Sequence, residues 1–250
     1  QLSYSPVHVQ AALDYIDAHS YWNHPRFPGR PWDPNDWSVR NVALVNSPGG
    51  TLGGLAARQV AGMAYTVSEY NHPAPNVYAA EGFPMIAALG AFQSWDGIFP
   101  FAYCHNADFE PRRIGSYFDI KCHTPKIAHM PACAALFLRG DVAPAQKTLK
   151  VGLSAEKERQ TLHDTLNVRS LTADNLGLDP RWSLRHGVAL DLKGKTTPDV
   201  PEIAAETTAF DSDTGQLRWD VSQPGAGYFI ADTPRTKLFT GFVRDRTFRL

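Results

Sequence analysis

Polar side chains able to do chemistry gather at two points of the chain, each directly after an apolar run typical of a β-strand. The first run covers residues 63–73 and the second covers residues 95–105. The polar residues at the two ends are Glu69, Asn71, His72, Tyr103, His105 and Asn106. A positioned carboxylate can act as a nucleophile or exchange a proton. Glu69 is the only acidic residue at either end, so the candidate site centres on it.

The segment between these runs predicts how they pair. A helix is expected over about Val77–Gln93, because apolar residues recur there every three to four positions. A strand, a helix and a second strand at this spacing form a βαβ unit, which requires parallel pairing. Ligands of parallel α/β folds bind outside the carboxyl ends of the strands. Both polar ends are therefore expected on one face of the fold.

A third strand is predicted over Tyr15–Trp22, followed by Asn23 and His24. With a period of two residues, Asp17, His19 and Tyr21 share one face of this strand. From a neighbouring strand end, the Tyr21 hydroxyl would reach Glu69 and keep it ionised through a charge-assisted hydrogen bond. The alternative to a catalytic role for Glu69 is a purely structural one, in a salt bridge at the end of the strand.

Histidines and aromatic residues near these ends leave two kinds of site open. His19, His24, His72 and His105 with Glu69 would suit zinc or iron, but none has a tight ligand spacing such as HExxH. Neutral histidine and asparagine both donate and accept hydrogen bonds, which fits sugar hydroxyls better. We therefore expect no metal and no cofactor. The rings that would stack on a sugar, or simply pack in loops, are Trp22, Trp32, Trp37 and Tyr103.

Composition excludes several other functions. The formal charge of −1 over 250 residues argues against nucleic acid or an anionic membrane as the main partner. No apolar run reaches the roughly 18 residues that span a bilayer. Ser47–Gly50 is glycine-rich but lacks the lysine of a phosphate-binding loop, and there is no GxSxG elbow. Cys104, Cys122 and Cys133 fit no metal or disulfide pattern; we expect free thiols, and the redox compartment stays open.

The remaining elements predict an α/β part followed by an all-β part. Helices are expected at Val7–Tyr15, Thr51–Ala61 and Lys126–Leu138, which makes three strand-then-helix units within residues 1–140. From 141 to 250, short strand-like runs separated by turn signals are typical of an antiparallel β-sandwich, with one charged helix at Ala155–Thr165. The runs are Leu149–Leu153, Ser183–Leu192, Gln216–Val221, Tyr228–Ala231 and Lys237–Val243.

Three stretches resemble strands six to eight of the (β/α)₈ barrel of the largest clan of retaining glycoside hydrolases. Asp17-Ala-His-Ser-Tyr-Trp22 resembles the sixth strand, which delivers a histidine and a tyrosine to the sugar. Tyr65-Thr-Val-Ser-Glu-Tyr-Asn71 resembles the seventh strand, which carries the nucleophilic glutamate. Trp95–Tyr103 resembles the eighth strand, which often ends in an aromatic platform. The residues after 140 resemble the β-sandwich that often follows such barrels.

The resemblance implies hydrolysis of the O-glycosidic bonds of β-linked oligo- or polysaccharides, with Glu69 as the nucleophile. The implied substrate-binding residues are His19, Tyr21, Trp22, Asn23, Asn71, His72, Tyr103 and His105. The acid/base glutamate of the clan's fourth strand, usually after an asparagine, has no counterpart, and a whole barrel needs about 200–250 residues. The chain thus resembles the carboxyl-terminal part of a larger enzyme.

A fragment of a barrel is expected to have open strand edges, here at Tyr15–Trp22 and Asp96–Tyr103. The missing amino-terminal half of the barrel, or another chain, would pair with these edges. The alternative function is a non-catalytic carbohydrate-binding or assembly protein derived from such a barrel.

Overall fold

A parallel sheet of three strands holds the predicted polar ends together. The computed structural model describes residues 7–107, 110, 112–165, 173–194 and 202–248. Strands β1 (Tyr15–Tyr21), β2 (Ala64–Asn71) and β3 (Gly97–Pro100) lie in the order β1-β2-β3, and both pairs are parallel. The predicted βαβ unit is confirmed, and so is the parallel third strand beside it.

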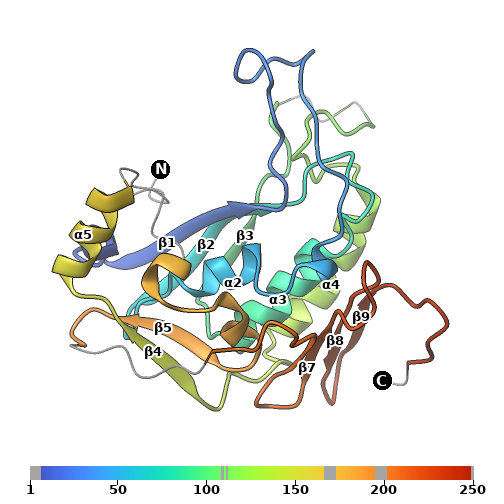
Figure 1. Ribbon diagram of the computed structural model, residues 1–250. Coiled ribbons are helices and arrows are strands. Elements are labelled where there is room, and N and C mark those ends of the chain that lie inside the picture. Colours follow the sequence, from blue (N-terminus) through green and yellow to red (C-terminus); the bar gives the residue numbers. More distant parts are fainter. Residues whose placement is uncertain (1–6, 108–109, 111, 166–172, 195–201, 249–250) are drawn as a thin grey trace.

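Helices follow each of these strands, as the sequence predicts. After the short α1 (Val7–Gln10), α2 (Thr51–Ala56) follows β1, α3 (Gly82–Phe92) follows β2, and α4 (Thr124–Phe137) follows β3. Nearly every residue of α3 is buried, because the helix lies between the sheet and α4 (Figure 1). Gly90 permits this close contact, since a Cβ there would meet the Ile98 side chain at 2.6 Å.

The second half differs in part from the predicted sandwich. Strands β4 (Thr148–Gly152) and β5 (Gly187–Asp191) pair in parallel and form a sheet of their own, with α5 (Ala155–Thr165) in their connection. Two 3₁₀ turns, η3 (Asp174–Leu176) and η4 (Pro180–Leu184), precede β5. The prediction that both runs belong to an antiparallel domain is wrong, because β4 and β5 run in the same direction. Their connection contains a helix and is long enough for the crossover that a parallel pair requires.

The expected antiparallel sheet is formed by the last four strands. They are β6 (Ala209–Asp211), β7 (Leu217–Asp220), β8 (Tyr228–Asp232) and β9 (Lys237–Gly241), paired in that order. Trp219 of β7 is fully buried and donates its indole hydrogen to the Val45 carbonyl in the turn η2 (Leu44–Asn46), at 2.8 Å. This sheet therefore packs directly on the α/β part.

The hydrophobic core continues across residue 140. Gln93, at the end of α3, is 3% exposed and bonds the carbonyls of Ser183 and His186 and the amide of Val188. In addition, the Leu190 amide of β5 donates to the Gln59 carbonyl at 2.7 Å. One cluster of buried apolar residues includes members from both halves.

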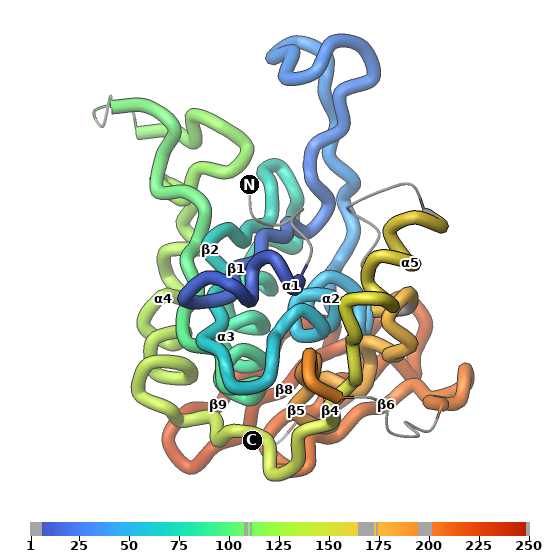
Figure 2. Tube along the Cα trace, turned by 90° about the vertical axis from the view of Figure 1, so that its left-hand side faces the viewer, coloured from blue at the N-terminus to red at the C-terminus, as the bar shows by residue number. Residues whose placement is uncertain are grey.

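Two long segments extend beyond the carboxyl ends of the parallel strands. The segment between β1 and η2 projects from the molecule, and the segment after β3 rises at the same end (Figure 2). Aromatic rings join them: the ring centroids of Trp37 and Tyr117 lie 5.3 Å apart, and those of His24 and Phe118 lie 5.5 Å apart. None of the helices described is long and apolar enough to cross a membrane.

Candidate active site at the carboxyl ends of β1 and β2

A β-bulge at Ser68 sets the direction of Glu69. Ala18 is opposite Val67, but the next residue, His19, is opposite Glu69, so Ser68 is the extra residue of β2. Before the bulge, Tyr65 and Val67 point into the core. Strict alternation would send Glu69 the same way, whereas one extra residue turns it to the opposite face. The bulge thus brings Glu69 to the face that carries His19 and Tyr21.

Glu69 is held from the neighbouring strand. The Tyr21 hydroxyl donates a hydrogen bond to Glu69 Oε2, which is the contact that the sequence predicts. The Tyr21 ring is itself fixed, because it stacks on Phe118 with a centroid distance of 4.3 Å. The Glu69 side chain is 30% exposed. A carboxylate that has one oxygen held by a hydrogen bond and is accessible to solvent can contact a ligand without a change in its side-chain conformation.

His19 connects Glu69 to a buried aspartate. Its Nδ1 lies 3.4 Å from Glu69 Oε2, and its Nε2 lies 2.7 Å from Ser68 Oγ and 3.0 Å from Asp17 Oδ2. The Ser68 hydroxyl donates to Asp17 Oδ2 at 2.6 Å, so it accepts rather than donates at His19. That direction is the reverse of what a serine nucleophile with a histidine base requires.

Asp17 anchors this network from within. It is 6% exposed and also accepts from the Thr66 hydroxyl at 2.6 Å and the Ser68 amide at 3.1 Å. Both carboxylate oxygens are therefore occupied by donors from β2 or by His19. Asp17 positions Ser68 and His19, while Glu69 is the carboxylate that a ligand can reach.

Asn71 and His72 lie deeper than the site and are 0% and 1% exposed. The Asn71 amide donates to the carbonyls of Phe101 and Phe118, which ties the segment after β3 to β2. Burial lowers the pKa of His72 to about 3, and its main-chain carbonyl accepts from buried Lys126 Nζ at 2.5 Å. Contact with a substrate would require both side chains to become accessible.

The remaining expected site residues are dispersed. Trp22 is 9% exposed, points away from Glu69 as its neighbour Tyr21 points towards it, and donates to the Val42 carbonyl at 2.9 Å. Tyr103 is 61% exposed. His105 Nδ1 lies 2.7 Å from buried Asp119 Oδ1. Asn23, in left-handed conformation with φ +57°, lines a different pocket.

Sequence reasoning did not identify Ser68, Phe118 or Asp119 as parts of this region. Phe118 and Asp119 belong to the long segment after β3, where no periodicity indicates what they contact. Ser68 carries no signal either, because a bulge follows from the pairing of three strands and not from one sequence. Asp17 is the exception: its place on the His19 face follows from strand alternation.

Within the part of the chain that the structure describes, no group of three or more His, Cys, Asp or Glu side chains could hold a metal ion. No protein-family model, curated protein or solved structure matches this chain.

Proposed function

We propose that this chain is the carboxyl-terminal part of a retaining glycoside hydrolase that acts on β-linked saccharides. The observation that carries the proposal is the accessible Glu69 carboxylate, bonded by Tyr21 and flanked by His19 at the carboxyl ends of adjacent parallel strands. A glycosidase nucleophile has to be ionised, aimed at the sugar and open to it.

Each contact of Glu69 has a part in this reaction. The Tyr21 hydroxyl stabilises the carboxylate and leaves Glu69 Oε1 for attack on the anomeric carbon. His19, fixed through Ser68 and Asp17, lies close enough to Glu69 to bond a sugar hydroxyl beside it. Exposed Tyr103 and the loop ring Trp32, which is 64% exposed, offer stacking surfaces.

A second carboxyl group is needed as acid and then base, about 5–5.5 Å from the nucleophile in a retaining enzyme. Asp17 is the other carboxylate in this network, and its oxygens are occupied in a buried place. We infer that the acid/base lies on the rest of a (β/α)₈ barrel, of which β1 to β3 and their helices would be the last three units.

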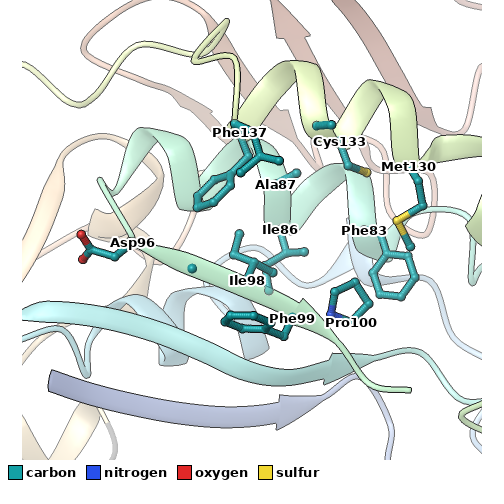
Figure 3. A pocket seen from close by; sticks show the side chains of 13 residues that line it. Phe83, Ile86, Ala87, Asp96, Ile98, Phe99, Pro100, Met130, Cys133 and Phe137 are labelled. Atoms are coloured by element: carbon teal, nitrogen blue, oxygen red, sulfur yellow. The ribbon is translucent and has the colours of Figure 1, made fainter. Parts of the chain in front are cut away.

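The open edge of β3 supports this inference. An apolar groove of about 440 Å³ lies between β3, α3 and α4 (Figure 3). Its apolar lining includes Phe83, Ile86, Phe99, Pro100, Met130 and Phe137. Among the described strands, β1 and β3 are the two edges of the sheet, and Phe99 on β3 is 56% exposed. A further strand and its apolar side chains would cover both the edge and the groove.

Trapping of the glycosyl intermediate tests the proposed function. A 2-deoxy-2-fluoro-β-glycoside with a dinitrophenyl leaving group needs no acid for its first step, and its ester with the nucleophile is long-lived. We expect a mass increase of the protein and a labelled peptide containing Glu69, with no label in Glu69→Gln. A label on another carboxylate would contradict the assignment of the nucleophile.

A non-catalytic carbohydrate-binding or assembly protein is the second candidate. The hydrogen bonds that Asp17 accepts favour this candidate. Because they engage both Asp17 oxygens, Glu69 is the one carboxylate of the described site that a ligand can reach, and hydrolysis needs two. Saturable binding of β-linked oligosaccharides without any trapped ester, in a protein whose barrel is whole, would select this function over hydrolysis.

A further inference from the structure

A second pocket lies on the other side of β1, away from Glu69. It has a volume of about 510 Å³ and is formed where the end of β1, the segment 40–47 and the start of the α3 region meet the last sheet. Trp22 and Asn23 line it directly after β1, and Phe242 and Arg244 line it from the chain after β9. Opposite side-chain directions of Tyr21 and Trp22 separate this pocket from the site of Glu69.

Hydrogen-bond donors dominate the wall of this pocket. Asn46 Oδ1 accepts the Gly227 amide at 2.8 Å, and Asn41 Oδ1 accepts the Val77 amide at 2.9 Å. Because a main-chain amide can only donate, the orientation of both side-chain amides is determined, and their NH₂ groups are the ends left for the pocket.

Two guanidinium groups add positive charge. Arg40 and Arg244 both line the pocket, and no carboxylate of the described lining offsets them. Neither side chain forms an ion pair in the described structure, unlike Arg139, Arg181 and Arg218, which are each bonded to aspartate. The Arg244 guanidinium lies 5.8 Å from the centroid of the Phe242 ring. Two arginines without a carboxylate partner beside amide donors are suited to binding an oxyanion.

The backbone around these donors is held in place before any ligand binds. The Asn76 amide donates to the carbonyls of Arg40 and Val42, at 3.3 and 3.2 Å. On the other wall, the Phe242 amide donates to the Gly227 carbonyl at 3.0 Å, and the Tyr78 and Phe242 rings lie 5.9 Å apart. Trp22, Tyr78 and Phe242 give the pocket an aromatic side that can contact the carbon face of a sugar.

From this geometry we propose that the pocket binds a sugar-sized molecule that carries an oxyanion group, a carboxylate or a phosphate. Arg40 and Arg244 neutralise the charge, the amides of Asn41 and Asn46 bond its oxygens, and the aromatic side contacts the ring. This site does not use Glu69 and is independent of glycoside hydrolysis.

Calorimetric titration of the chain tests the proposal with four probes: glucuronate, glucose 6-phosphate, inorganic phosphate and glucose. We expect saturable binding of glucuronate or glucose 6-phosphate in the millimolar range or tighter, and weaker binding of glucose. Tighter binding of glucuronate would identify the oxyanion as a carboxylate, and tighter binding of glucose 6-phosphate would identify it as a phosphate. Inorganic phosphate alone is expected to bind more weakly than glucose 6-phosphate, because it lacks the ring contact.

Three variants of the pocket and one control separate charge from folding. Arg40→Gln and Arg244→Gln should each weaken binding by about threefold to tenfold, more at low salt, because both arginines are exposed. The matched control is Arg235→Gln, which removes an exposed arginine outside the pocket. Asn46→Asp keeps the acceptor for the Gly227 amide but replaces a donor with a negative charge, so binding should be lost while the melting temperature is retained.

Three outcomes would overturn the proposal. The first is an absence of saturable binding of all four probes in the millimolar range. The second is glucose binding as strongly as the charged sugars. The third is binding that Arg40→Gln, Arg244→Gln and Asn46→Asp leave unchanged in variants that melt like the wild type. Since Glu69→Gln leaves this pocket intact, failure of the hydrolase assignment would not alter these results.

Discussion

The Tyr21 hydroxyl donates a hydrogen bond to Glu69 across the β1–β2 pair. His19, two residues earlier on β1, flanks the same carboxylate. In the proposed complete hydrolase, Tyr21→Phe removes this donor and keeps the ring that stacks on Phe118. A hydrogen bond to a charged group contributes about 1.5–3 kcal/mol, so kcat/KM should fall by about 10–100-fold. Tyr15→Phe, at the exposed start of the same strand, is the control and should leave the rate unchanged.

Glu69→Gln in the proposed complete hydrolase should separate sugar affinity from rate. The change preserves volume at a partly exposed strand end, so folding should persist, whereas an amide is a very poor nucleophile. We expect kcat to be abolished while oligosaccharide affinity, measured by calorimetry, stays within about threefold of the wild type. Full activity in this variant would remove the retaining mechanism from Glu69.

Residues 1–250 alone should not hydrolyse a glycoside at an enzyme-like rate. The described site has one accessible carboxylate, and general acid catalysis typically contributes about 10²–10⁴-fold. Steady-state assays with nitrophenyl and unactivated β-glycosides check this expectation. Robust turnover by this chain would mean that it already holds an acid/base.

Burial of Glu81 should make the stability of the protein depend on pH. Burial raises the pKa of Glu81 to about 7 from an ordinary value of 4.5, although the Val45 and Leu44 amides act in the opposite direction. A raised folded-state pKa contributes stability below about pH 4.5 that is lost as the pH rises towards 7. Glu81→Gln lacks this titration, so from pH 5 to pH 8 the wild type should lose roughly 2–3 kcal/mol of unfolding free energy relative to the variant.

Urea unfolding of the two proteins at both pH values measures this difference. Lys126, whose burial lowers its pKa to about 7, has the opposite dependence between pH 7 and 10.5, but it is common to both proteins and cancels. Glu156→Gln, on the exposed face of α5, is the control. An equal change with pH in the wild type and Glu81→Gln would show that Glu81 is not the titrating group.

The three cysteines should differ in reactivity. Burial raises the pKa of Cys133 to about 11, whereas Cys122 is exposed. Because the thiolate is the nucleophile, a disulfide reagent at pH 8 should modify Cys122 rapidly and Cys133 slowly in the folded protein. The denatured, unreduced chain should count three thiols, and a count of one would reveal a disulfide.

Local patterns predicted much of the fold. Apolar periodicity located α3, and the β–α–β spacing predicted the parallel pairing of β2 and β3. Strand alternation also placed Asp17, His19 and Tyr21 on one face of β1, which is the face that Tyr21 uses to bond Glu69. These features depend on residues close together in the chain or on general rules of connection, so one sequence is enough to predict them.

Long-range packing decided the rest. The bulge at Ser68 arises from the simultaneous register of β1, β2 and β3, and without it Glu69 would face the core. Asn71 and His72 are buried because a segment about 30 to 55 residues later in the chain covers them, through Phe101, Phe118 and Lys126. β5 pairs in parallel with β4 and also bonds the main chain at Gln59. None of these partners can be read from the neighbours of the residues concerned, and therefore the tertiary structure alone determines which polar side chains a ligand can reach.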